Sequence, residues 1–377
     1  FGSSIQGLRA PGRAAAMCGA DDPPELPPKA PAWDEIKALL AGLGPSGSDD
    51  ICALYRAIFS LRQSAPSQAA AIGMLVQALR LRQGADVGGA GRPGHAFFRS
   101  VLFRHECCYL LGQIGADCDD LVAREEAYAC LYEVLCDDAE DEVTRHEAAE
   151  GIAAVQGGAG DQDGGPGPGG ADAAASEMLQ ALERFARHGG GVGPLAETCY
   201  LAAEGIRRRN TRRVCACQYA SHDPAIGDVG AQQEDVPRYR TQLEEQGGDL
   251  FQRYVAMFTL RNLGAADALA EALGRDRSSV VLRHELAFVL GQLEDDAALA
   301  ALVRSLGDAS EHAMVRHEAA IALGSIGGDG AKAALRRFAQ DAEPMVAESC
   351  RVALDTAAYW EAWERVEARM GRDGSPH

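Results

Sequence analysis

The chain has 377 residues, of which 47% are hydrophobic and 24% are charged. This length is enough for two or more ordinary domains, and the apolar content is too high for a wholly disordered protein. The formal net charge of −19 disfavours binding to nucleic acid or to anionic membranes and favours a basic partner or substrate. No apolar run approaches the roughly 18 residues of a spanning helix. We therefore expect a soluble protein, with neither nucleic acid nor a membrane as its partner.

The cysteines and the first residues bear on the compartment. There are eleven cysteines, an odd number, and no Cys-x-x-Cys pair occurs. Several lie in apolar, helix-like runs, which is typical of reduced structural thiols and indicates a cytoplasmic protein. Residues 1–20 carry Arg9 and Arg13 but no acid before Asp21, as in transit peptides, so organelle targeting stays open as an alternative.

The chain begins with an expected disordered extension over residues 1–32, which has five prolines between positions 23 and 31. From residue 33 onward, segments of 10 to 15 residues with Ala- and Leu-rich helical periodicity alternate with short Gly, Asp or Pro breaks. Strand-like alternation is absent. Few aromatic residues and many alanines suit closely stacked helical hairpins better than one large globular core. The sequence therefore predicts an all-α protein.

Four sequence blocks occur twice, in the same order. The matching pairs are 55–62 with 254–261, 103–113 with 282–292, 144–149 with 315–320, and 196–199 with 347–350. Within the second copy, His284 and His317 are 33 residues apart, which fits one helix-turn-helix repeat of the HEAT type. The duplication predicts an α-α superhelix of about eight helical hairpins in two pseudo-symmetric halves.

The domain boundaries follow from composition. Two glycine-rich stretches, near 84–100 and 157–175, are expected as flexible loop insertions in the first half, because repeat stacks accept additions in loops. The other expected segments are a first half at 33–210, a linker at 211–248, a second half at 249–367 and a tail at 368–377.

Four of the nine histidines lie in identical Arg-His-Glu triplets, at 104–106, 145–147, 283–285 and 316–318. One explanation is that a duplicated repeat carried the triplet as a solvated helix start, where Glu is favourable in the first turn. Only the second and third hairpins of each half carry the triplet, however. This restricted distribution favours a chemical role.

Imidazole and carboxylate are the ligands of non-haem iron, where two His and one carboxylate leave positions open for oxygen. Zinc uses the same residue types but has no need of a doubled set. Neighbouring inner helices lie about 8 to 10 Å apart, so long side chains from both can reach one ion. If the superhelix curves until its halves face each other, two such sites form one dinuclear centre. The predicted ligand sets are His105, His146 and Glu147 for one metal and His284, His317 and Glu318 for the other.

The repeated blocks resemble deoxyhypusine hydroxylases over most of residues 50–360. The blocks with the resemblance are RHECCYLLGQ (104–113), RHEAAEGI (145–152), AETC (196–199), YVAMFTLRNLG (254–264), RHELAFVLGQL (283–293) and MVRHEAAIALGSIG (314–327). The resemblance implies an eight-repeat HEAT dyad that binds two Fe²⁺ ions, with O₂ as co-substrate. It also implies hydroxylation of the deoxyhypusine side chain of translation initiation factor five-A to hypusine. We expect the protein to be a monomer.

Carried over residue by residue, the resemblance assigns the same six residues to iron. It further implies that Glu106 and Glu285 face the substrate rather than the metal. Deoxyhypusine is a long, doubly cationic amine, so a carboxylate at the mouth of the site would orient it. The acidic protein would also steer a basic partner toward the site.

One spacing departs from the family pattern. His105 and His146 are 41 residues apart, eight more than His284 and His317. The extra residues near 115–126 are expected to bulge away from the inner face, since otherwise the two histidines lose register. Two alternatives to the hydroxylase stay open. A non-catalytic HEAT-repeat interaction scaffold would bind no metal, and a bilin-lyase-like helical-repeat protein would not require all four His-Glu pairs.

Overall fold

The computed structural model describes residues 30–40, 50–81, 99–157, 171–187, 192–209, 219 and 221–373. Over these ranges the protein forms sixteen α-helices and no strand. None of the helices in these ranges has both the length and the apolarity of a membrane-spanning segment. The predicted all-α fold is confirmed.

The first half consists of four hairpins, each with an outer helix followed by an inner helix that packs against it. The helices are α1 (Trp33–Leu40), α2 (Ile51–Ser64), α3 (Gln68–Arg80), α4 (Val101–Asp117), α5 (Leu121–Cys136), α6 (Glu142–Gly157), α7 (Ala171–Arg187) and α8 (Pro194–Arg209). The even-numbered helices pack side by side as the inner row, most closely α4 on α6 and α6 on α8.

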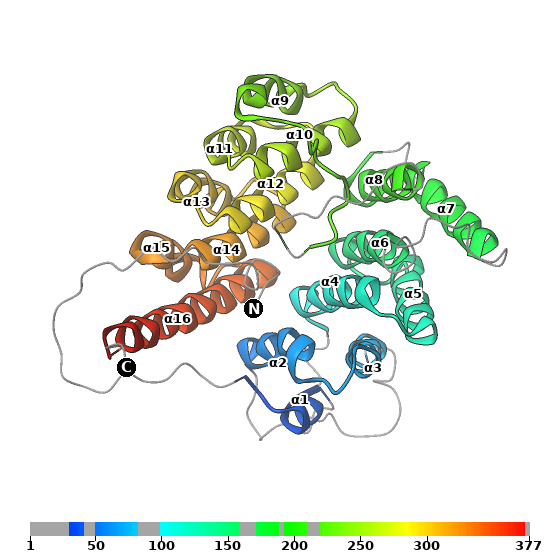
Figure 1. Cartoon of the computed structure of the whole chain (residues 1–377), viewed down its shortest axis with the longest axis horizontal. Coiled ribbons are helices and arrows are strands. Elements are labelled where there is room, and N and C mark those ends of the chain that lie inside the picture. Colours follow the sequence, from blue (N-terminus) through cyan, green and yellow to red (C-terminus); the bar gives the residue numbers. More distant parts are fainter. Residues whose placement is uncertain are drawn as a thin grey trace.

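The second half repeats this arrangement. Its helices are α9 (Val236–Glu244), α10 (Leu250–Asn262), α11 (Ala266–Arg275), α12 (Val280–Leu293), α13 (Leu299–Gly307), α14 (Ala313–Ile326), α15 (Gly328–Phe338) and α16 (Pro344–Asp373). Figure 1 shows the two halves curving toward each other, with α16 returning beside α2 and α4. The predicted HEAT superhelix of eight hairpins in two halves is therefore confirmed for the described residues.

Two equivalent serines start the inner helices α4 and α12. Ser100 Oγ accepts the N–H of Phe103 at 3.2 Å, and Ser279 Oγ accepts the N–H of Leu282 at 3.0 Å. These caps satisfy backbone donors that have no partner inside the helix. Because the two helices begin at equivalent positions, the Arg-His-Glu residues that follow lie at the same height in both halves.

The same serine hydroxyls join one half to the other. Ser100 donates to Glu348 of α16 at 2.5 Å, and Ser279 donates to Glu197 of α8 at 2.7 Å. Glu197 and Glu348 are equivalent residues of the duplicated AETC and AESC blocks. The two junctions are therefore copies of one contact, and together they hold the arc closed around its centre.

Small residues allow the inner helices to approach closely. A Cβ atom added to Gly112 of α4 would lie 2.5 Å from the Cα of Gly151 in α6. At the equivalent place in the second half, a Cβ on Gly291 would lie 3.0 Å from the Cα of Ala322. Side chains of any size at Gly112 or Gly291 would force the helices apart. This spacing brings the histidines of neighbouring inner helices within reach of one another.

Several boundaries differ from the expected ones. Helix α9 lies inside the expected linker 211–248 and packs on α10, so the second half begins earlier. Only Tyr239 and Leu243 of this short helix are buried, which is too little apolar periodicity to be recognised in the sequence. Helix α16 continues to Asp373, past residue 367, and α7 begins within the expected insertion 157–175. The expected extension 1–32 and the insertion 84–100 lie almost entirely outside the described residues.

The eight extra residues between His105 and His146 do not form a bulge. Helix α4 has 17 residues where its equivalent α12 has 14, and α5 has 16 where the short 3₁₀ helix Asp296–Ala298 (3 residues) and α13 (9 residues) stand in the second half. The added length lies at the far end of α4 and in an outer helix. Most of the extra residues therefore lie away from the inner face, as expected, but they lengthen helices rather than form a bulge, and the two histidines keep their register.

Candidate metal centre

The four Arg-His-Glu triplets lie on α4, α6, α12 and α14, the inner helices of the second and third hairpins of each half. All four histidines and all four glutamates are buried, as are all the arginines except Arg145. Charged and imidazole side chains are rarely buried unless they are paired or bind a ligand. Interpretation of the triplets as solvated helix starts is therefore wrong.

The arginines of the triplets hold neighbouring hairpins together. Arg104 of α4 binds Glu140, in the turn before α6, at 2.5 Å. Arg283 of α12 binds Glu311, in the turn before α14, at 2.8 Å. These pairs are nearly buried, so loss of one partner would leave an uncompensated charge. The arginine of the triplet thus has a structural role, and only the His-Glu pair faces the centre of the arc.

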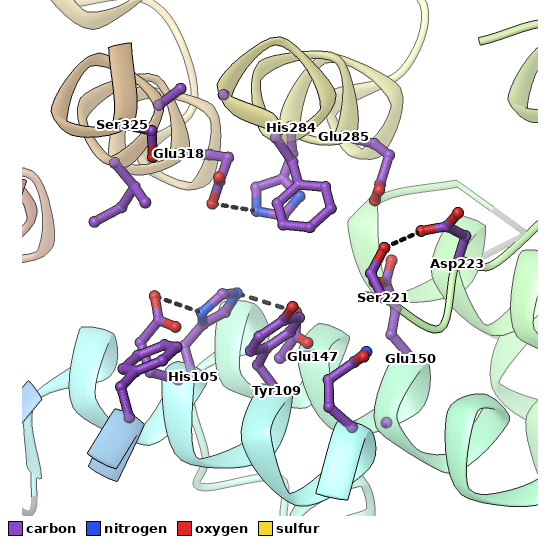
Figure 2. A pocket seen from close by; sticks show the side chains of 18 of the residues that line it. His105, Tyr109, Glu147, Glu150, Ser221, Asp223, His284, Glu285, Glu318 and Ser325 are labelled. Carbon is purple, nitrogen blue, oxygen red and sulfur yellow. Dashed lines mark hydrogen bonds and ion pairs between the residues drawn. The ribbon is translucent and has the colours of Figure 1, made fainter. Parts of the chain in front are cut away.

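The four histidines from the two halves form one cluster. The ring centroids of His105 and His317 are 4.8 Å apart, and those of His146 and His284 are 5.2 Å apart. Both of these pairs join different halves. Figure 2 shows His105 extending from one half toward His284 of the other, 6.0 Å away between ring centroids. Closure of the arc therefore makes one shared centre out of two sets of residues.

In the first half, the predicted ligands come together through Glu147. Its Oε2 lies 3.2 Å from His105 Nε2 and 3.8 Å from His146 Nε2. His105 belongs to α4 and the other two residues belong to α6. The close approach of the two helices at Gly112 therefore brings the three side chains together. A cation among these three atoms would be within reach of all of them after small side-chain adjustments.

The second half repeats the arrangement around Glu318. Its Oε2 lies 3.6 Å from His284 Nε2 and 3.4 Å from His317 Nε2. One ligand atom of each of these three residues lies within 4.8 Å of the others. Both predicted sets thus surround one buried space, but among the described residues only the second set forms a group of this kind by itself, whereas His105 and His146 group with His284 of the other half.

The two glutamates that were expected to face the substrate have different surroundings. Glu106 Oε1 lies 3.8 Å from His105 Nδ1, and Glu106 groups with His105 and His317 as a further set of metal-ligand geometry. Both glutamates line the cavity beside the cluster, and Figure 2 shows Glu285 on the same side of it as Glu150. Duplicated residues have therefore diverged in environment, and the substrate-facing role of both stays a prediction.

Burial controls the protonation of the cluster. It lowers the pKa of His146 to about 4 and the pKa of His317 to well below its usual value. Burial, together with the Glu106 carboxylate, raises the pKa of Glu318 to about 8. Burial also lowers the pKa of His105, but neighbouring carboxylates outweigh it and leave this pKa well above the usual range. Most of the imidazoles are thus neutral, with lone pairs available to a cation.

Buried imidazole nitrogens without a hydrogen-bond partner mark the centre. Within the described part of the protein they are Nδ1 and Nε2 of His105 and of His284, Nε2 of His146 and Nε2 of His317. An unsatisfied buried polar group costs about 1 to 3 kcal/mol, so such a concentration of imidazole nitrogens suits the binding of a cation. Neutral imidazoles with interleaved carboxylates are a donor set for first-row transition metals. The residues therefore fit a dinuclear metal centre.

A cavity of about 70 Å³ opens beside the cluster, lined by Tyr109, Phe288 and several acids. One of these acids, Glu150, was missed in the sequence. It lies four residues after His146, on the same face of α6, with its Oε1 4.0 Å from His146 Nε2. The second half has Ile321 at the equivalent position. The i, i+4 spacing in RHEAAEG was the signal, and this residue breaks the pseudo-symmetry of the cavity.

A segment of the expected linker also lines the cavity. The backbone N–H of His222 donates to Gln113 Oε1 at 2.9 Å, and Gln292 Nε2 donates to Ser221 Oγ at 3.2 Å. Gln113 and Gln292 are equivalent residues of the two halves. One segment that binds both of them must lie near the pseudo-dyad. The sequence did not indicate this placement, because the segment has no periodicity and no recognisable motif.

The fold and the centre together define an all-helical HEAT-repeat protein whose two halves share a buried histidine-carboxylate cluster suited to metal ions. A family model described as HEAT repeats matches residues 265–355. Mouse deoxyhypusine hydroxylase is 38% identical over 264 residues, which cover 69% of this chain and 77% of the relative. The zebrafish (Danio rerio) enzyme of the same name is 38% identical over 87% of this chain and 93% of its own.

The solved structures agree with these relatives. Human deoxyhypusine hydroxylase in complex with glycerol superposes with a TM-score of 0.66 at 34% identity, covering 86% of this chain and 96% of the human one. The chain belongs to the deoxyhypusine hydroxylase family. The resemblance inferred from the repeated blocks is thereby confirmed, as is the expectation of an oxidoreductase of the monooxygenase type. The scaffold and bilin-lyase-like alternatives are not supported.

Proposed function

We propose that the protein is a di-iron monooxygenase that uses O₂ to hydroxylate the deoxyhypusine side chain of translation initiation factor five-A, which completes hypusine. The observation that carries this proposal is the shared cluster of four buried imidazoles with the carboxylates of Glu147 and Glu318. Membership of the deoxyhypusine hydroxylase family supplies the substrate.

Each half would hold one Fe²⁺, with the ligands His105, His146 and Glu147 in the first half and His284, His317 and Glu318 in the second. Bound iron would supply the activation of O₂ that puts one oxygen atom into a C–H bond of the substrate. The protein's own contribution is placement. The side chains around the cluster are buried, which keeps bulk water from the reacting carbon.

The cavity suits a long cationic amine. Glu285 is 3% exposed, and burial together with the neighbouring Glu150 raises its pKa well above the usual value. These two acids therefore lack a compensating positive charge, which an ammonium group of the substrate would supply. The rings of Tyr109 and Phe288 line the cavity and meet edge to face, with centroids 6.4 Å apart. They offer apolar walls for the methylene groups, while the acids hold the charged end.

The substitution Glu285→Gln keeps the size of this side chain and removes the carboxylate with which a substrate ammonium group would pair. We expect the KM for the deoxyhypusine-containing protein to rise about 10- to 100-fold, because the substrate would lose one charge-assisted hydrogen bond. The iron content should stay unchanged. Steady-state kinetics and metal analysis measure the two quantities. Glu271→Gln on the outer helix α11, 42% exposed at its side chain, is the matched control and should change neither. An unchanged KM in Glu285→Gln would remove this residue from substrate binding.

The activity itself is tested on the iron-loaded full-length protein. With O₂, a reductant and deoxyhypusine-containing factor five-A, we expect the modified residue to gain one oxygen atom by mass spectrometry. Metal analysis should find about two irons per molecule, one for each three-ligand set. A deoxyhypusine hydroxylase relative serves as the positive control on the same preparation of factor five-A. If the relative hydroxylates that preparation and the iron-loaded protein does not, the proposed function is wrong.

We further propose that the protein acts as a monomer in the cytoplasm. One molecule supplies both ligand sets, so the centre needs no second copy. The eight cysteines among the described residues are free thiols, which suits a reducing compartment. Light scattering on the purified protein and fractionation of cells test these two points.

A further inference from the structure

The duplicated AETC and AESC blocks carry two hydroxyl side chains that the centre described so far does not use. Thr198 lies on α8 and Ser349 on α16, the inner helices of the fourth hairpins. Both side chains are fully buried. These hairpins have no Arg-His-Glu triplet, so their inward-facing hydroxyls need another explanation.

Each hydroxyl contacts one histidine of the centre. Thr198 Oγ1 lies 2.6 Å from Nδ1 of His146, and Ser349 Oγ lies 3.2 Å from Nδ1 of His317. The two contacts occupy equivalent places in the two halves. In both imidazoles the other nitrogen, Nε2, faces the cluster and has no hydrogen-bond partner in the described structure.

The direction of these hydrogen bonds follows from counting protons. Thr198 Oγ1 donates its proton to the carbonyl oxygen of Pro194 at 2.9 Å, and Ser349 Oγ donates to that of Met345 at 2.7 Å. Both acceptors lie four residues earlier, the usual partner of a hydroxyl inside a helix. A hydroxyl has a single proton. Toward the imidazole it can only accept, so the proton between them belongs to Nδ1.

We propose that Thr198 and Ser349 are positioning residues that fix His146 and His317 in the Nδ1-protonated tautomer, with the Nε2 lone pair directed into the metal centre. A ligand imidazole whose other nitrogen is held by a partner keeps its tautomer and its ring orientation. The inference rests on the proposed function only in taking the cluster as a metal site.

The other two histidines are different. The nearest polar groups of His105 and His284 are carboxylates of the cluster, with Glu147 3.2 Å from His105 Nε2 and Glu318 3.6 Å from His284 Nε2. The four imidazoles thus fall into two classes, because in each half one ring is held by a hydroxyl from the fourth hairpin and the other contacts carboxylates of the cluster. The fixed ring of each half lies on the third hairpin, next to the fourth hairpin that holds it. The AETC and AESC blocks therefore contact two of the proposed ligands on the side that faces away from the cluster.

The tautomers can be measured without iron. Long-range ¹H–¹⁵N spectra of the metal-free, ¹⁵N-histidine-labelled full-length protein should show His146 and His317 protonated at Nδ1. Thr198→Val keeps the shape of the side chain and should release His146 alone, whereas Ser349→Ala should release His317 alone. Each variant is thus an internal control for the other. An Nε2-protonated His146 and His317 in the unaltered protein would overturn the proposal.

Anaerobic titration with Fe²⁺ gives the second readout. Thr198→Val and Ser349→Ala should each weaken binding at one site about 10- to 100-fold, while Thr198→Ser should bind within a few fold of the unaltered protein. Thr144→Val is the matched control, because this buried hydroxyl on α6 has no hydrogen-bond partner within the described residues. Unchanged tautomers and unchanged Fe²⁺ affinity in folded Thr198→Val and Ser349→Ala would refute the positioning role. Neither measurement needs hydroxylase activity, so the two proposals fail separately.

Discussion

Replacing His317 with alanine is expected to remove iron from the second half of the centre and to reduce hydroxylation more than about 100-fold. The ring is fully buried, and its Nε2 lies 3.4 Å from Glu318 in the cluster. Changes in residues that merely support a ligand already cost about 10- to 100-fold, so loss of a ligand itself should cost more. Metal analysis should find about one iron per molecule, and turnover of deoxyhypusine-containing factor five-A should be undetectable or nearly so.

The same helix offers a control for this substitution. His312 caps α14 five residues before His317, and its ring accepts the N–H of Met314 at 3.3 Å. His312→Asn removes one imidazole and keeps a residue that is favourable at a helix start. It should bind two irons and keep its activity. If His317→Ala also binds two irons and turns over normally, the ligand assignment of the second half is wrong.

Gly112→Ala is expected to lower the free energy of unfolding by about 1 to 3 kcal/mol and to weaken Fe²⁺ binding in the first half. The new Cβ would lie 2.5 Å from the Cα of Gly151, and a backbone atom cannot rotate out of the way. Helix α4 must therefore shift from α6, which separates His105 from Glu147. Chemical denaturation and anaerobic Fe²⁺ titration measure the two effects.

Gly73→Ala provides the comparison. Gly73 is also inside a helix, α3, but a Cβ there would meet no atom within 4 Å. Alanine is favoured over glycine in a helix by about 1 kcal/mol, so this variant should be slightly more stable than the unaltered protein. Iron binding should be unchanged. Equal stability gains in Gly73→Ala and Gly112→Ala would show that close helix approach is not what places the histidines.

Much of the fold and of the candidate site could be predicted because the sequence contains an internal duplication. Residues 103–113 and 282–292 repeat a helix in which five residues separate the RHE triplet from a glycine. Periodicity identified the helices, and repetition identified the hairpins that carry the His-Glu pairs. The six proposed ligands followed from ligand chemistry alone. Short helices without strong periodicity, such as α9, could not be found in this way, because tertiary packing stabilises them.

The roles of individual residues within a repeated motif depended on the tertiary structure. Arg104 and His105 are neighbours in the sequence, yet one binds a turn of the next hairpin and the other faces the centre. Glu106 and Glu285 are equivalent in the duplication and both line the cavity, but of the two only Glu106 groups with histidines in metal-ligand geometry among the described residues. Glu150 has no acidic counterpart in the second half. Sequence equivalence does not specify which side chains oppose each other once the arc closes.

The amino-acid sequence by itself determined the helical class, the duplication and the types of side chain available for chemistry, since these depend on local periodicity and on composition. The tertiary structure decided that the halves close so that the two sets of histidines share one centre, which the sequence had left conditional, and it alone decided that Thr198 and Ser349 contact two of them and that residues 221–223 line the cavity. These relations join residues far apart in the sequence. They exist only because closure of the arc brings the inner helices of both halves together around a buried space.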